Sequence, residues 1–527
     1  MALRRRIAVD LANVYSSATG RKVMTTLAWG DEIDVEQVTA KHVKIKIRFF
    51  RELDDGTMEP VSKTGFIRPT KSSKIKPSEV VVKKSEIDVL KVDFVDIQQG
   101  DASVIETPKG KVILLDGGDN QLFARYLAGR YGGTSDAKPL AITAIVVSHG
   151  DADHFKGLTE IHESETHATA HKRIFIRPER VYHNGLVKRP GKKPNGKTRK
   201  ENEMLGATKA VAGKVVVTEL ESNLTTVSDA KMNKPFRDWK KALKGWKKRG
   251  PIKFRRLERG DDDAFDFLAN EDIEVDVLGP ALTNAGNKKG LVFLGRPKEK
   301  FRAGHESLFL DESAFTGTSA SHTINGHSIV LRIKYGRFRF LFSGDLNDQA
   351  GRELTRAHNA GEVDLESEVF KVPHHGSADF SAALLEAVSP IISVVSSGDE
   401  NPAKEYIHPR ATLVGALGKF SRVEEPLLFV TELVAFFRVE GFVRPEFHRL
   451  DNDGDAVVKN GEAVVNDKTR TSFFAFSRTA FGIVKVRTDG ERLLVYTNSG
   501  QQRLKEAYVY GIDEDTGKLR PERVRRV

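Results

Sequence analysis

Four potential metal ligands lie within six residues of one loop, and this loop constrains the fold more than any other stretch of the sequence. The ligands are His149, Asp151, Asp153 and His154. An apolar run with strand character, Ala141 to Val147, comes directly before the loop, and a helical pattern begins near Gly157. A strand that ends in a loop of His and Asp brings several ligands to one point, which predicts a divalent metal site.

The length and composition of the chain exclude several classes of site. With 527 residues, the chain is long enough for two or three domains and a large core. It contains no cysteine, so disulfides, thiolate zinc sites and cysteine nucleophiles are excluded. No apolar run approaches the roughly 18 residues of a membrane span, and the basic start lacks the apolar core of a signal peptide. We therefore expect a soluble, cytoplasmic protein without membrane contacts.

Positive charge is concentrated in two segments of a chain whose formal net charge is +11. Residues 172–200 and 236–256 contain eleven and ten Lys or Arg residues, with one acidic residue each. Such a run is often only a solvated loop, but the second one is interleaved with aromatic residues. Lysines can neutralise phosphates and indole rings can stack on bases. The sequence therefore predicts a nucleic-acid partner, with these candidate contact residues: Trp239, Lys240, Lys241, Trp246, Lys247 and Lys248.

Further ligand-type residues follow two later apolar strands. Asp345 comes after the run 337–342, and His374 with His375 comes after 369–372. We expect these strand ends to converge on the loop at one sheet edge and to form a two-metal site. His149 and Asp151 would bind one cation, and Asp153 and His154 the other. Asp345 would bridge cations roughly 3.5–4 Å apart, and His374 or His375 would complete the set.

These motifs, taken in order, resemble a known family. The segments "FVDIQQGDASVI", "ILLDGG", "VVSHGDADHFKGL", "FLFSGDL", "VPHHGS" and "IHPR" are similar to those of metallo-β-lactamase-fold hydrolases. They look most like the soluble nuclease-type domain of the DNA-uptake protein ComEC and its stand-alone relatives. The resemblance covers roughly residues 90–435. It implies an α/β fold, an αββα sandwich, and a metal-dependent phosphodiesterase, with a nuclease as the preferred interpretation.

The sequence departs from the usual His-x-His-x-Asp-His pattern of that family at one position. Asp151 stands where the second histidine is usual. An added carboxylate makes the site harder, which favours Mn²⁺ or Mg²⁺, while Zn²⁺ stays possible. The ligand expected before Asp345 is also ambiguous, because His322, Asn325 and His327 all lie in that region. We therefore expect the first of the two cations to be the more weakly held.

Several residues receive expected roles in hydrolysis by a metal-activated water. Asp153 would orient this water or accept its proton, and His408 would donate a proton to the leaving oxygen or hold a phosphate. Ser377 would help to cradle an anion. Asp116 is expected to brace the loop, and Asp96 and Asp101 to act as turn groups or as supports of the ligands. His183 and Asn184 either form a wall of the site or belong to an ordinary turn.

The chain order suggests three regions. Residues 1–85 read as about five short strands, which resemble a bacterial SH3-like barrel, followed by a linker. Such a module would bind a protein partner or a neighbouring domain. Residues 86–500 would form the metallo-β-lactamase-fold domain, with basic insertions near 172–260 and a further insertion near 440–470. Residues 501–527 would form a charged tail.

Two alternatives to a nuclease remain open from the sequence. The first is a hydrolase of a small phosphodiester, such as a cyclic nucleotide, or of a lactone or amide. The second is a non-catalytic module that binds nucleic acid or a protein partner.

Overall fold

The computed structural model describes most of the chain. It covers residues 3–52, 58–69, 73–297, 315–398, 408–431, 458–459, 462–463, 482–498, 507–513 and 518–527. The insertion expected near 440–470 lies outside the described residues, apart from the two-residue strands β28 (Val458–Lys459) and β29 (Glu462–Ala463).

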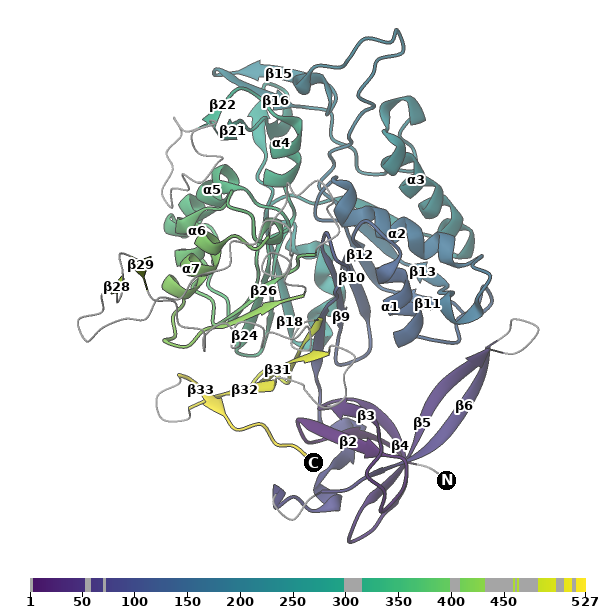
Figure 1. The fold of residues 1–527 in the computed structure, drawn as a ribbon. Helices are drawn as coiled ribbons and strands as arrows, with labels where there is room; N and C mark the ends of the chain where they lie inside the picture. The colour runs from purple at the N-terminus through teal and green to yellow at the C-terminus, as the bar shows by residue number, and fades with distance from the viewer. Residues whose placement is uncertain are drawn as a thin grey trace.

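Two large sheets form the centre of the molecule (Figure 1). The ten-stranded sheet has the order β17 (Lys253–Arg256), β14 (Arg180–His183), β12 (Ala144–Val146), β10 (Val112–Asp116), β9 (Ala102–Glu106), β8 (Leu90–Phe94), β30 (Ile483–Thr488), β31 (Leu493–Asn498), β32 (Ala507–Ile512) and β33 (Leu519–Glu522). The six-stranded sheet has the order β18 (Ile273–Gly279), β23 (Val330–Tyr335), β24 (Phe338–Phe342), β25 (Val369–Lys371), β26 (Ile392–Val395) and β27 (Leu427–Val430).

Alternation along the strands explains why the sheets stack with helices on both outer faces. In β10, Ile113 and Leu115 pack into the core between the sheets, whereas Val112 and Leu114 pack into the core under the helices. Successive side chains of a strand point to opposite faces, so a strand that is apolar throughout must be covered on both. The result is the expected αββα sandwich.

The helices divide between the two outer faces (Figure 1). The ten-stranded sheet is covered by α1 (Leu122–Arg130), α2 (Ala152–Ser164) and α3 (Lys234–Trp246). The six-stranded sheet is covered by α5 (Asp348–Asn359), α6 (Ala382–Val388) and α7 (Ala411–Lys419), and the short α4 (Ala320–Gly326) contacts α5. Among the helices that the structure describes, none has the length and apolar character needed to span a bilayer.

The basic segment near 172–260 is part of the core, contrary to its expected character as an insertion of surface loops. It supplies two strands of the ten-stranded sheet, β14 and β17, and the helix α3. Smaller sheets lie beside it: β11 (Leu140–Ile142) pairs with β13 (Ile176–Pro178), and a four-stranded sheet has the order β15 (Thr208–Val211), β16 (Lys214–Val217), β20 (Lys288–Val292) and β19 (Thr283–Ala285). A two-stranded sheet pairs β21 (Arg296–Pro297) with β22 (Phe315–Thr316).

Residues near the N-terminus form a separate antiparallel sheet. Its order is β3 (Val23–Ala28), β2 (Leu11–Tyr15), β6 (Met58–Ile67), β5 (Val43–Glu52), β4 (Glu32–Val38), β1 (Leu3–Ile7) and β7 (Val81–Lys83). Seven strands replace the five that were expected, because β1 and β7 add one edge. A small β domain was therefore a sound expectation, and its likeness to SH3 domains stays a prediction.

The C-terminal residues correct another expectation. Instead of a charged tail, β32 and β33 extend the ten-stranded sheet. The chain then returns to the N-terminal sheet, where the Val527 N–H donates to the Leu11 carbonyl at 3.0 Å.

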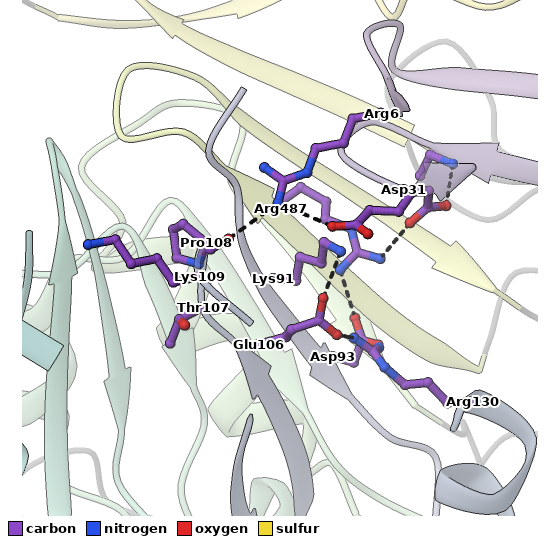
Figure 2. Close-up of polar contacts among 12 residues, drawn as sticks. Arg6, Asp31, Lys91, Asp93, Glu106, Thr107, Pro108, Lys109, Arg130 and Arg487 are labelled. Atoms are coloured by element: carbon purple, nitrogen blue, oxygen red, sulfur yellow. Dashed lines mark hydrogen bonds and ion pairs between the residues drawn. The ribbon is translucent and has the colours of Figure 1, made fainter. Parts of the chain in front are cut away.

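A charged network joins the N-terminal sheet to the sandwich (Figure 2). The buried carboxylate of Asp93 accepts hydrogen bonds from Arg130, Lys485 and Arg487. Arg487 also lies 3.6 Å from Asp31 of the N-terminal sheet, and Arg6 donates to the Pro108 carbonyl at 3.3 Å. Because these charges are buried, each needs its partner, which fixes how the two parts dock.

Candidate metal centre

The ligand loop lies where β12 ends and α2 begins. Asp151 is the N-cap of α2, with extended backbone, and Asp153 and His154 occupy the first helical turn. Close backbone contacts hold this turn: the Gly117 N–H donates to the His154 carbonyl at 2.7 Å. At Gly100, where φ is +109°, an added Cβ would lie 2.0 Å from the Asp153 carbonyl oxygen. Only glycine fits there, so the conspicuous "QQGD" turn serves to clamp the loop.

Three strand ends converge at this edge of the sandwich, as the sequence predicted. His154 Nε2 lies 3.2 Å from Asp345 Oδ1, and His375 Nε2 lies 3.3 Å from Asp345 Oδ2. Asp153 Oδ2 is 3.5 Å from His375 Nε2, and His149 Nε2 is 3.8 Å from Asp345 Oδ2. Since β12, β24 and β25 belong to two different sheets, the site spans the junction between them.

The inward-facing atoms of these residues fit a cation. The Nε2 atoms of His149, His154 and His375 and the Oδ1 atom of Asp345 are buried, and no hydrogen-bond partner is found for them among the described residues. Buried polar atoms without partners are costly, and a bound metal is one way to satisfy them together. Imidazole nitrogens and carboxylate oxygens are the donor types that Zn²⁺ and Mn²⁺ accept.

The outward-facing nitrogens of two of these histidines meet carboxylates. His154 Nδ1 lies 2.9 Å from Asp116 Oδ2, and Asp116 also accepts hydrogen bonds from the Ser148 amide and hydroxyl. His375 Nδ1 lies 3.2 Å from Asp101 Oδ1 and also 3.2 Å from the Ser396 carbonyl. A carboxylate on Nδ1 holds the proton there and turns the Nε2 lone pair towards the centre. The expectation that Asp116 braces the loop is confirmed.

Asp101 has a larger place in the site than the sequence indicated. Asp101, His154, Asp345 and His375 each bring one donor atom to within 4.8 Å of the others. Asp101, however, approaches the Nδ1 side of His375 and accepts a hydrogen bond from the buried ammonium of Lys371. We therefore interpret it as the group that orients His375 and not as a ligand.

Carboxylates dominate the electrostatics of the donor cluster. Burial lowers the pKa of His154, but Asp345 and Asp116 outweigh burial and raise that pKa well above its usual value. Burial also lowers the pKa of His375, but Asp345 and Asp101 outweigh burial and raise that pKa well above its usual value. Burial lowers the pKa of His149 to about 4, with a contribution from His154. Two histidines thus attract protons into a space where a divalent cation would neutralise the same carboxylates.

Asp151 and His374, also expected to bind metal, lie at the margin of the cluster. Both oxygens of Asp151 have protein partners: Lys188 Nζ donates to Oδ1 at 2.9 Å, and the amide of Asn325, with its nitrogen turned towards Asp151, donates to Oδ2 at 2.9 Å. His374 Nε2 is 3.9 Å from Asp345 Oδ2. His374 and His375 both have positive φ, 50° and 53°, a strained backbone typical of functional sites. This turn places His375 inside the cluster.

A cavity of about 360 Å³ opens over the cluster. Asp153, Asn325 and His408 line it together with these residues: Gln99, Asp119, Asp151, Ala152, Lys156, Ser321, Asp345, His374 and His375. Burial, followed by His375 and His374, lowers the pKa of His408 to about 3, so its imidazole is neutral at neutral pH. The expected position of His408 beside the site is confirmed, and its catalytic role stays a prediction.

Three further expected contact residues serve turns instead of the cavity. Both ring nitrogens of His183 have backbone partners, at Gly185 and Ser222. Asn184 donates to the His327 carbonyl at 2.9 Å and accepts from the Leu186 N–H. The Ser377 N–H donates to the His374 carbonyl at 2.8 Å and is therefore not directed at an anion. For His183 and Asn184, the turn interpretation was the correct alternative.

The interpretation of Trp239 and Trp246 as stacking platforms was wrong. Both indoles are buried in the core between α2 and α3, with their rings 5.6 Å apart in an edge-to-face arrangement. Lys240 is also buried, and its ammonium donates to the Val227 carbonyl and to Asp229. Lys241, Lys247 and Lys248 are exposed, as expected of phosphate contacts.

Lys247 and Lys248, which directly follow α3, lie far from the donor cluster. Trp246 and Arg249 both contact Glu165, which follows the C-terminal end of α2. The donor cluster is at the other end of α2, 13 residues away, or about 20 Å along the helix axis. A substrate that contacts both places must therefore be long.

Part of the chain is similar to known proteins. Residues 95–217 match the family model described as the Metallo-beta-lactamase superfamily. Among solved structures, the chain is similar to Tm1679, a metal-dependent hydrolase of the beta-lactamase superfamily, with 12% identity and a TM-score of 0.29 over 66% of this chain and 96% of that one. No curated protein matches. Residues 95–217 are thus similar to the Metallo-beta-lactamase superfamily, and His154 of the buried donor cluster lies within this matched segment.

Proposed function

We propose that this protein is a metal-dependent phosphodiesterase that cleaves nucleic acid. The proposal rests on the buried donor atoms of His154, Asp345 and His375, which lie beneath an open cavity and have no hydrogen-bond partner among the described residues. A divalent cation held by these donors supplies Lewis acidity, which polarises a phosphoryl group and makes water a stronger nucleophile at neutral pH.

Asp153 is the residue best placed to handle the attacking water. Its side chain lines the cavity, and its Oδ2 atom is 3.5 Å from His375 Nε2. Burial raises the pKa of Asp153, but His375 and His154 outweigh burial and hold that pKa far below its usual value. Asp153 therefore stays a carboxylate. It can therefore orient water or accept its proton. The neutral imidazole of His408 would offer a hydrogen bond to the leaving oxygen from the other side of the cavity.

Two features of the cavity favour a phosphodiester over a lactone or amide. The N-terminus of α2 opens onto the cavity at Ala152 and Asp153, and a helix N-terminus attracts anions. Lys156 lines the same cavity one turn further along α2. A neutral substrate would gain little binding energy from either the helix N-terminus or Lys156. The carboxylate and imidazole donors of the cluster suit Mn²⁺ or Zn²⁺, with Mg²⁺ as a further candidate.

Support for a polymeric substrate comes from the exposed lysines of α3, the net charge of +11 and the motif resemblance to ComEC-type nuclease domains. One observation favours a small phosphodiester as a second candidate. The indoles expected to stack on bases are buried, and the exposed Lys247 and Lys248 lie about 20 Å along α2 from the donor cluster.

The test is a cleavage screen with chelator-treated protein to which Mn²⁺, Mg²⁺ or Zn²⁺ is returned. Substrates are single- and double-stranded DNA, RNA, a cyclic nucleotide and an activated aryl phosphodiester. We expect polymer cleavage that is lost in Asp345→Ala and retained in the matched control Asp96→Asn.

The outcomes separate the candidates. Turnover of the small phosphodiesters alone, unchanged when Lys241, Lys247 and Lys248 are replaced by Ala, would select the second candidate. Metal binding without any hydrolysis, together with retained nucleic-acid binding, would leave only a binding function.

A further inference from the structure

The two halves of the donor set are satisfied in different ways. Around Asp345, the inward donor atoms of His154 and His375 have no hydrogen-bond partner among the described residues. Around Asp151, both carboxylate oxygens are already engaged, one by the Lys188 ammonium at 2.9 Å and one by the Asn325 amide at 2.9 Å. A cation therefore has an evident place in the first half. In the second half, His149 Nε2 also has no hydrogen-bond partner among the described residues, but a cation that bound Asp151 there must displace a lysine.

Lys188 is held in this position by its surroundings. The preceding residues Leu186 and Val187 are buried, and the Lys188 carbonyl accepts a hydrogen bond from the N–H of Asn233, the N-cap of α3. Its side chain is only 28% exposed. Because the backbone is anchored on both sides, the ammonium reaches Asp151 with little loss of conformational freedom.

One divalent cation leaves no excess positive charge in the site. Asp101 is paired with Lys371, whereas Asp116 contacts Nδ1 of His154, an imidazole that would be neutral as a metal ligand, so Asp116 keeps its negative charge. The carboxylates of Asp153 and Asp345 then face a single cation of charge +2, while Lys188 compensates Asp151. A second divalent cation beside Lys188 would place excess positive charge in a buried site, where unpaired charge is costly.

We propose that Lys188 takes over the charge-balancing role of the first metal position, so that this centre holds one divalent cation, at His154, Asp345 and His375. This inference rests on the proposed metal-dependent function. Lys188 is then a positioning residue, which keeps Asp151 ionised and oriented at the cavity without a metal of its own. It also explains how Asp151 can replace a histidine, because a carboxylate pairs with an ammonium and an imidazole does not.

The test measures bound Mn²⁺ per chain by elemental analysis after equilibrium dialysis, together with the electron paramagnetic resonance spectrum. Wild type should bind about one ion per chain and show the six-line spectrum of an isolated Mn²⁺. Lys188→Met should bind about two and show the spectrum of a coupled pair, and Lys188→Arg should restore one. Lys193→Met is the matched control, because Lys193 forms a similar ion pair with Glu203 at 2.8 Å outside the site.

Each other outcome overturns part of the account. Two ions in wild type, or one ion in a folded Lys188→Met protein, would refute the role of Lys188 while leaving the proposed hydrolase intact. No tightly bound ion in any variant would refute the metal-dependent function itself. If Lys188→Met does not fold, His149→Ala tests the single-site assignment instead. This variant should still bind one ion, and loss of that ion would contradict the assignment.

Discussion

Replacing Asp101 should weaken metal binding without removing a ligand. Asp101 holds Nδ1 of His375 and is the charged partner of Lys371 among the residues that the structure describes. Asp101→Asn keeps an acceptor for His375 but removes the negative charge that strengthens its Nε2 as a donor. Changes to groups that orient metal-bound histidines cost roughly 10- to 100-fold in affinity. The expected loss is therefore about 1.4–2.7 kcal/mol of metal-binding free energy.

The same substitution also leaves the Lys371 ammonium buried without its carboxylate. Removal of one partner of a buried ion pair costs about 3–5 kcal/mol of folding stability. A double-mutant cycle separates the two effects. Asp101→Asn combined with Lys371→Met should regain stability, since no charge is then left unpaired, but should not regain metal affinity.

The assays are calorimetric titration of Mn²⁺ or Zn²⁺ and chemical unfolding of the metal-free protein. Asp96→Asn, from the same turn, is the control and should match wild type in both. Wild-type metal affinity in a folded Asp101→Asn protein would refute the view that Asp101 orients His375. Recovery of metal affinity in the double variant would show instead that the loss came from the stranded lysine.

Three further predictions follow from other parts of the molecule. Trp246→Ala should lower the free energy of unfolding by about 3–5 kcal/mol, because the indole is fully buried; a loss of nucleic-acid affinity at unchanged stability would contradict its placement. Replacement of Lys241, Lys247 and Lys248 by Ala should flatten the salt dependence of DNA binding and leave turnover of an aryl phosphodiester unchanged. Burial, with help from Asp379 and against Arg352, raises the pKa of Asp348 to about 7. The folded state therefore binds this proton more tightly than the unfolded state, and the free energy of unfolding falls as pH rises from about 4 to 7. Asp348→Asn should be more stable than wild type at pH 8. A difference in melting temperature between the two proteins that does not grow with pH would refute this.

The sequence predicted the position of the donor cluster well because strand ends carry local signals. Apolar runs that stop at His or Asp placed His154, Asp345 and His375 at one sheet edge, and the motif resemblance to metallo-β-lactamase-fold hydrolases implied the two-sheet sandwich. Lys188 could not be found in this way. It is one of eleven basic residues in residues 172–200, and only the tertiary structure shows which of them reaches Asp151. Lys371 did carry a signal, since it interrupts the apolar run 369–372.

The error over the tryptophans has a physical cause. Phe236, Trp239, Leu243 and Trp246 recur at intervals of three and four residues, which is the spacing of a buried helix face. The lysines between them suggested nucleic-acid binding, although their positions correspond to the opposite, solvated face of the helix. Lys240 shows that even this division is incomplete, because its long side chain is buried and reaches a backbone carbonyl.

The most direct test of the central claim is anomalous diffraction from crystals of the protein grown with Mn²⁺ or Zn²⁺. The account predicts a peak about 2.0–2.2 Å from His154 Nε2, His375 Nε2 and an Asp345 oxygen. A structure of the folded protein at saturating metal with no peak among these atoms, or with metal bound only elsewhere, would contradict it.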